Sequence, residues 1–246
     1  MFVQVSRASA RELLRSGFTI AVMVLIFALL LGLYAGIDAL ISAATGAPSG
    51  ILKSNLGAVL AIAFMTIAFI GTSVTLVSYR QRGTLRLIGT TPIPRSTFVL
   101  GQIPIRLAIA ASEILGALLL VTILKFTEPE QLPALAGSML LGFLMLLSFG
   151  FLLGARGSNP DFTMQISAIV PVVAVFTART VLPLNAFPLW IQKVIDFLPT
   201  TWFMDAVNVS LGTGTPGWTL PALWLAMAAV TLAVTLVSAT IFRWDN

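Results

Sequence analysis

The sequence passes from LGAVLAIAFMTIAFIGTSVTLVS at residues 56–78 directly into YRQRGTLRLIGTTPIPR at residues 79–95. The first stretch contains no charged residue and is long enough to cross a hydrocarbon core, which takes about 20 apolar residues in a helix. The second stretch holds four arginines, although only 9% of the whole chain is charged. We therefore predict a membrane-spanning helix followed by a segment that stays in water beside the membrane.

The composition extends this interpretation to the whole chain. Of the 246 residues, 58% are hydrophobic and the mean hydropathy is +1.00, which excludes an ordinary globular surface. Cysteine and histidine are absent, so disulfides, thiol and imidazole chemistry and the usual zinc ligands are excluded, and we expect no metal site and no catalytic residues. The net charge of +5 is scattered between apolar runs, and we therefore expect no nucleic-acid partner.

We predict an all-α membrane protein, because unpaired backbone groups are costly in lipid and the alternating pattern of a barrel is missing. The first apolar run is longer than that of a signal peptide, and we expect it to be retained. Residues 1–16 mix arginines with apolar residues, which is typical of an amphipathic helix on the membrane surface. The six predicted spans of this single domain are 17–38, 56–78, 98–124, 134–155, 163–183 and 218–242.

The basic residues predict the orientation. If the N-terminus is cytoplasmic, nine arginines fall inside and three lysines outside, which agrees with the positive-inside rule and places both termini in the cytoplasm. The inner residues are Arg7, Arg11, Arg15, Arg80, Arg82, Arg86, Arg95, Arg156 and Arg243, and the outer ones are Lys53, Lys125 and Lys193.

The connection between the last two spans, residues 184–217, is unusually apolar and aromatic for a loop. Pro199 interrupts it between the segments that carry Trp190 and Trp202. We expect two short helices that dip into the outer leaflet, with the tryptophans at the interface. Such a pair would form a plug at the outer mouth.

The segment between Gly83 and Pro92 has room for about two helical turns, with Leu85 and Ile88 along one edge. By its chemistry alone it is either a helix that docks in a groove of another protein or a basic loop on anionic headgroups.

Three runs in and after this segment resemble the coupling-helix region of ABC-2-type transporter permeases, of the type V exporter kind. They are Arg80-Gln81-Arg82-Gly83-Thr84-Leu85, Thr91-Pro92-Ile93-Pro94 and Leu100-Gly101-Gln102. Residues 198–206, LPTTWFMDA, are similar to the re-entrant hairpin of that family, which corresponds to about residues 185–212 here. The resemblance extends over essentially the whole chain.

This resemblance implies a coupling helix at about residues 83–92 that contacts a separate ATPase subunit, and a second permease subunit, identical or related. ATP and Mg would bind to the partner, and this chain would bind no cofactor. The residues implied in coupling are Arg80, Arg82, Gly83, Thr84, Leu85, Arg86, Ile88 and Pro92. The family's subunit contact implies Gly32 and Gly36 at the dimer interface. Tyr79, Gln81 and Arg86 stand where the family commonly has acids, so we expect an unusually acidic partner groove.

Four charged residues within the spans need an explanation. We expect Arg106 to snorkel to the cytoplasmic headgroups. Glu113 lies at the centre of its span, where it either makes a structural hydrogen bond between helices or lines the transport pathway. Arg179 and Asp38 both lie at outer span ends, and we hypothesise that they pair.

The leading interpretation is the permease subunit of an ATP-driven exporter for an amphipathic or lipid-like molecule, located in a bacterial-type plasma membrane among its lipids. The sequence contains no G-x-x-x-x-G-K-[ST] segment, so it has no P-loop. The alternatives are an ion-driven secondary transporter, which would show paired intramembrane charges and inverted repeats, and a membrane-embedded enzyme, which would need a catalytic constellation.

Overall fold

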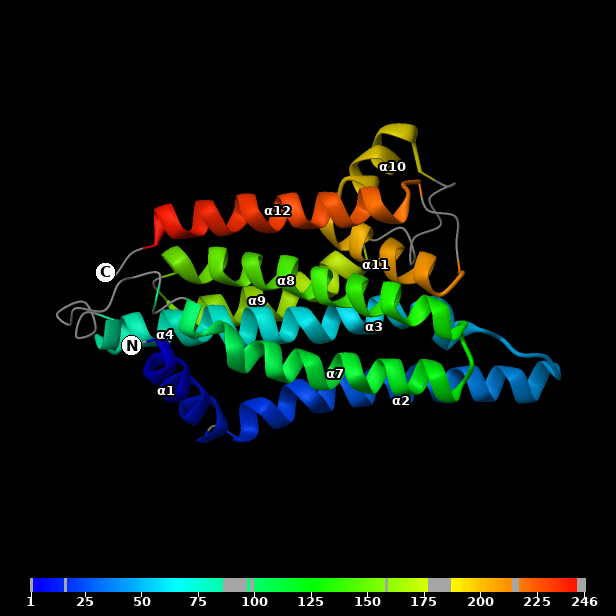
Figure 1. The fold of residues 1–246 in the computed structure, drawn as a ribbon, viewed down its shortest axis with the longest axis horizontal. Coiled ribbons are helices and arrows are strands. Elements are labelled where there is room, and N and C mark those ends of the chain that lie inside the picture. Colours follow the sequence, from blue (N-terminus) through cyan, green and yellow to red (C-terminus); the bar gives the residue numbers. More distant parts are fainter. Residues whose placement is uncertain are drawn as a thin grey trace.

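The computed structural model describes residues 2–15, 17–85, 97, 100–157, 159–176, 187–213 and 217–242 (Figure 1). Within these ranges the regular structure is entirely helical, which confirms the all-α prediction for them. Five of the helical segments are long and apolar enough to cross a membrane: Thr19–Thr45, Ile51–Gln81, Ile103–Ile123, Pro129–Arg156 and Leu220–Ile241. The fifth predicted span corresponds to the shorter apolar helix α9, Pro160–Phe176, and its predicted remainder lies outside the described residues.

The centre of the bundle is a continuous helical rod formed by α3 (Ile51–Met65), η1 (Thr66–Val74) and α4 (Thr75–Gln81). The middle piece, η1, is a π-helix. In the most apolar 18-residue stretch of this rod 78% of the residues are buried, whereas only 11% are buried in the equivalent stretches of α2 and α12. The rod is therefore the core around which the other helices pack.

The outer helices α2 (Gly17–Thr45) and α12 (Leu220–Ile241) present apolar side chains on their outward faces. Leucines at positions 25, 29 and 33 of α2 are exposed, as are those at 225, 232 and 236 of α12. Spacings of four and seven residues place such side chains on one face of a helix, as expected for contact with lipid.

The first span is longer than predicted, and its acidic residue has a different role from the one expected. Helix α2 continues to Thr45, and the Asp38 carboxylate within it accepts hydrogen bonds from the backbone N–H groups of Ile51 (2.7 Å) and Leu52 (3.4 Å) and from the Ser49 hydroxyl. A carboxylate satisfies the free N–H groups at a helix start and interacts favourably with the helix dipole. Asp38 thus caps α3, and the hypothetical partner Arg179 lies outside the described residues.

Helix α8 (Leu132–Arg156, preceded by the short 3₁₀ turn η2, Pro129–Gln131) approaches the rod through glycines. A Cβ atom added at Gly150 would overlap the backbone carbonyl of Ala68, and one at Gly154 would lie 3.1 Å from the Cα of Ser73. The Ser73 hydroxyl donates a hydrogen bond of 2.7 Å to the Gly150 carbonyl. Small residues that allow backbones to meet are a common way to join helices in lipid.

The remaining helices mark two ends of the bundle (Figure 1). Helix α1 (Phe2–Arg15) lies at the end where α4 and α12 finish, whereas α10 (Leu189–Asp196) and α11 (Pro199–Ser210) lie at the opposite end. Helix α7 (Ile103–Ile123) runs alongside α2 and α8. The predicted helix at residues 1–16 and the predicted break at Pro199 are both present.

Candidate functional site

The segment predicted to couple to an ATPase begins at the end of α4, and its first arginine is not in water. Arg80 is only 5% exposed. Its guanidinium donates hydrogen bonds to the carbonyls of Ala155 (2.9 Å), Gly154 (3.2 Å) and Gly157, and lies 5.8 Å from the centre of the Phe242 ring. These carbonyls end α8, where unpaired oxygens and the helix dipole both favour a cation. Arg80 therefore ties α4 to α8, which corrects the expectation that it stays in solvent.

The next residues end α4 and turn the chain. Arg82 is exposed, and Gly83 adopts a φ of 71°, with its N–H donating to the Arg80 carbonyl at 3.0 Å. A left-handed glycine after the last helical residue is a common helix stop. Thr84 is half-buried and Leu85 fully buried in the chain's own core. Leu85 thus anchors the segment instead of offering its side chain to a partner, while Arg86, Ile88 and Pro92 lie outside the described residues.

The expectation that Arg106 snorkels to the headgroups is wrong. Its side chain is 1% exposed and turns into the bundle. Nε donates to the Thr72 hydroxyl at 2.6 Å, Nη2 to the Gly71 carbonyl at 2.7 Å, and Nη1 to the backbone carbonyl (2.6 Å) and side-chain Oε1 (2.9 Å) of Gln102. A buried guanidinium is tolerable only when its donors are satisfied. Arg106 joins α7 to the rod.

The π-helix η1 supplies two of these acceptors, the Thr72 hydroxyl and the Gly71 carbonyl. In a π-turn the backbone bonds run from i to i+5, and such irregular turns are frequent at functional sites. The Thr72 hydroxyl donates to the carbonyl of Ile67, five residues earlier, while accepting from Arg106. The Gly71 carbonyl also accepts from the Thr75 hydroxyl at 3.2 Å. The irregular turn and the buried arginine are therefore two parts of one arrangement.

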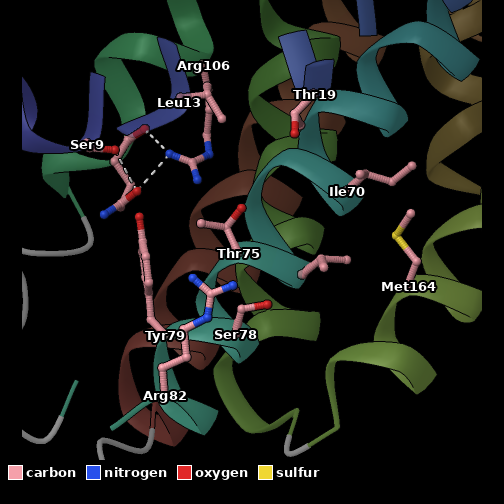
Figure 2. Close-up of a pocket in the computed structure, with 12 residues that line it drawn as sticks. Ser9, Leu13, Thr19, Ile70, Thr75, Ser78, Tyr79, Arg82, Arg106 and Met164 are labelled. Carbon is pink, nitrogen blue, oxygen red and sulfur yellow. Dashed lines mark hydrogen bonds between the residues drawn. The ribbon is translucent and has the colours of Figure 1, made fainter. Parts of the chain in front are cut away.

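Helix α1 is connected to the same network. The Ser9 hydroxyl donates to Gln102 Oε1 at 2.8 Å, the oxygen that also accepts from Arg106 (Figure 2). A Cβ atom at Gly101 would lie 2.6 Å from Cγ1 of Val5, so α1 touches the start of α7 closely. Hydrogen bonds thus run from the N-terminal helix through α7 into the rod.

Glu113 lies two turns beyond Arg106 and on the same side of α7, since seven residues bring a helix back to nearly the same direction. It is 1% exposed, and neither carboxylate oxygen has a hydrogen-bond partner among the described residues. Among the described residues, Glu113 therefore does not form the structural hydrogen bond between helices that the sequence allows. A buried polar group without a partner is costly, which makes Glu113 the exceptional acid of the described bundle.

The two glycine pairs have different surroundings. Gly150 and Gly154 pack directly against the backbone of the rod, so they are not accessible to another chain. Gly32 and Gly36 are exposed on α2, and a Cβ atom at either would meet nothing within 4 Å. The second pair therefore lies on the outer surface of the isolated chain, and its place at a dimer interface stays a prediction.

The predicted outer residues have distinct positions. Pro199 opens α11, Trp190 on α10 is 67% exposed, and Trp202 is 9% exposed. The Trp202 indole donates to the Asp196 carbonyl at 2.8 Å and stacks on Trp218 with ring centres 5.9 Å apart. Trp202 therefore fixes the angle between the two helices, while Trp190 faces outward.

The described residues contain no cluster of three or more acidic, histidine or cysteine side chains that could hold a metal ion. What the described residues do show is a set of apolar helices joined by the hydrogen bonds of two buried arginines, with one buried acid, Glu113, that has no hydrogen-bond partner among them.

Comparison with known families identifies the class. A model of the family described as ABC-2 family transporter protein matches residues 42–240, most of the chain. The chain therefore belongs to the ABC-2 transporter family and is a transmembrane permease of an ABC transporter, as the resemblance predicted. A search of curated proteins gives no match.

Proposed function

We propose that this chain is the membrane-spanning subunit of an ATP-driven exporter that moves an amphipathic or lipid-like molecule outward. A separate ATPase subunit would bind ATP and Mg and dock on the cytoplasmic segment that follows α4. A second permease subunit, identical or related, would pack against the α2 face that carries Gly32 and Gly36. The outer pair α10 and α11 would enter the outer leaflet as a re-entrant hairpin.

One observation carries this proposal: the rod is bonded to two neighbouring helices close to its docking end. Arg80 holds α4 to the last carbonyls of α8, and Arg106 holds η1 to α7. Force applied beyond Gln81 would therefore be passed from the rod to α8 and α7 by directional bonds. In a membrane, packing and hydrogen bonds are the main forces between helices. These links are therefore well suited to pass a displacement of the rod to its neighbouring helices.

Glu113 is our candidate for the pathway itself. Because its carboxyl group is buried without a partner among the described residues, rotation of α7 during transport would bring it to a wet cavity or to a polar group of the cargo. Glu113→Gln should leave ATPase association intact and alter transport. Unchanged transport by this variant would remove Glu113 from the pathway.

The partner is tested by purifying the assembled complex in mild detergent and identifying a subunit with a P-loop by mass spectrometry. Ile88→Asp should reduce its recovery at least tenfold while membrane insertion persists. Lys193→Asp places the same new charge on the exposed surface of α10, at the other end, and should have no effect. Leu85→Asp should misfold the chain, because Leu85 is buried. Equal ATPase recovery with Ile88→Asp and Lys193→Asp would refute docking at this segment.

A further inference from the structure

A cavity lies between α1, the start of α2, the rod, α7 and α9, beside the arginine network (Figure 2). Its volume is about 280 Å³, close to the lower end of small-molecule sites, which is roughly 300 Å³. The lining is divided: in the view of Figure 2, Arg106, Tyr79 and Arg82 are drawn on one side, and Ile70 and Met164 on the other. The cavity thus has a polar and an apolar part.

The polar part is cationic. Arg82 and Arg106 both contribute, and none of the described lining residues is acidic. The guanidinium of Arg106 is directed to Gly71, Thr72 and Gln102, so it contributes mainly its charge, whereas Arg82 is exposed at the rim. A guanidinium matches the geometry of a phosphate, and its attraction is strengthened where water is excluded.

The apolar part leads outward. Met164 on α9 lines the cavity and is 45% exposed, so part of the apolar lining lies at the outer surface of the bundle, where lipid is expected. A ligand that fits therefore has a single anionic head and an apolar chain that leaves past Met164. Free phosphate would satisfy only the first half of this requirement.

We propose that this cavity binds the phosphate headgroup of an anionic phospholipid from the surrounding bilayer, with one acyl chain leaving along α9. Basic pockets between membrane helices are a recurrent site for such headgroups. Because the cavity touches α1, the rod and α7 at once, the bound lipid stabilises the junction through which these helices are linked. The site does not depend on the ATPase and goes beyond the proposed transport function.

The test measures lipid retention by the purified full chain, without any partner, using native mass spectrometry. Mixed micelles contain phosphatidylglycerol, phosphatidylcholine or diacylglycerol, and a fourth sample contains inorganic phosphate. We expect one phosphatidylglycerol to be retained at least tenfold over phosphatidylcholine and diacylglycerol. Inorganic phosphate should not compete at millimolar concentration.

Three variants locate the site. Arg82→Gln should lower the retention of phosphatidylglycerol at least fivefold. Val74→Phe, which fills the cavity without changing its charge, should do the same. Arg156→Gln removes an exposed arginine that does not line the cavity and should leave retention unchanged. Thermal unfolding in detergent identifies any variant that fails to fold.

Each of the following results would overturn the proposal. Equal losses for Arg82→Gln and Arg156→Gln would show that binding depends on general surface charge. Equal retention of phosphatidylcholine would remove the requirement for an anionic head, and efficient competition by inorganic phosphate would make the ligand a soluble anion. Retention unchanged by both cavity variants would place the lipid elsewhere.

Discussion

The two ends of the bundle differ in their most prominent buried contacts, although hydrogen bonds such as that from the Trp224 indole to the Ser138 hydroxyl (2.9 Å) also occur at the end near α11. At the end formed by α1, α4 and the start of α7, Arg80 and Arg106 donate hydrogen bonds to backbone carbonyls and side chains of neighbouring helices. At the opposite end, α11 packs through buried aromatic rings, with Phe203 beside Phe64 at 5.8 Å and Phe64 beside Phe143 at 5.4 Å. Hydrogen bonds from a guanidinium are directional, whereas ring packing depends on filling space.

This difference suggests that the two ends of the bundle have different roles. Directional bonds fix the relative positions of helices when one of them is displaced, and they lie at the end proposed to meet the ATPase. Close packing resists separation, and it lies at the end proposed to close the outer mouth. We therefore expect changes at the aromatic end to affect mainly stability, and changes at the arginine end to affect mainly the linkage between helices.

The largest expected effect on stability is at the aromatic end. Phe203 is fully buried and its ring occupies the space beside Gly142. Phe203→Ala should lower the free energy of unfolding by about 3 kcal/mol, the lower part of the range for Phe→Ala in packed cores. Unfolding by detergent titration measures this. The control Leu225→Ala removes a 74% exposed side chain of α12 and should change little. Similar losses for both variants would contradict tight packing at Phe203.

The second effect sharpens the comparison at the arginine end. Arg106→Leu should cost about 2 kcal/mol of stability, because lost bonds from a charged donor are partly offset by the removal of a buried cation. It should also loosen α4 relative to α7. Since the chain has no cysteine, spin labels at introduced Arg82→Cys and Leu100→Cys report this distance directly.

We expect the distance distribution to broaden in Arg106→Leu and to remain narrow in Phe203→Ala. Arg106→Lys keeps the charge but not the multiple bonds, and it should give an intermediate width. A narrow distance distribution in Arg106→Leu would contradict the proposal that the arginine end links the helices.

A smaller effect is expected from the indole of Trp202. Trp202→Phe removes the hydrogen bond to the Asp196 carbonyl and should cost about 1 kcal/mol. Trp190→Phe changes an indole that is 67% exposed and serves as the matched control in the same unfolding assay. An equal cost at both positions would mean that the Trp202 bond does not order α10 and α11.

The smallest effect on the chain's own stability is expected at Gly32. Gly32→Ala should leave the chain at least as stable, because alanine favours a helix interior over glycine by about 0.5–1 kcal/mol and the added methyl group meets no atom within 4 Å outside its own helix. Gly150→Ala, which overlaps the Ala68 carbonyl, should destabilise clearly. If α2 forms the subunit contact, Gly32→Ala should nevertheless weaken dimers measured by cross-linking in vesicles. Unchanged dimers would argue against Gly32 as an interface residue.

Hydropathy and proline placement predicted much of the fold. The spans at 134–155 and 218–242 agree closely with α8 and α12, and the break at Pro199 separates α10 from α11. These features depend on local composition. The extension of α2 to Thr45 was missed because the end of an apolar run marks the membrane boundary and not the end of the helix.

The candidate site was harder to predict, because its contacts join distant parts of the chain. Residues 66–74 look like any apolar helix, and nothing local signals a π-helix whose acceptors meet Arg106 34 residues away. The polar neighbours of Arg80 in the sequence predict a position in water. The structure instead buries its guanidinium against the backbone carbonyls at the end of α8. Only Gln102 gives a weak signal, because this polar residue stands four positions before the intramembrane Arg106, whereas no local pattern points to Ser9.

The central claim is that the end of the rod near Gln81 faces the ATPase. It is tested by attaching a short photo-cross-linker to a single introduced cysteine, Arg82→Cys or, as control at the other end of the rod, Lys53→Cys, in the purified complex. We predict cross-links to the P-loop subunit from position 82 alone, with a yield that changes when ATP and Mg are added. Cross-links from position 53 instead, or a transport-competent assembly that contains no ATPase, would contradict the account.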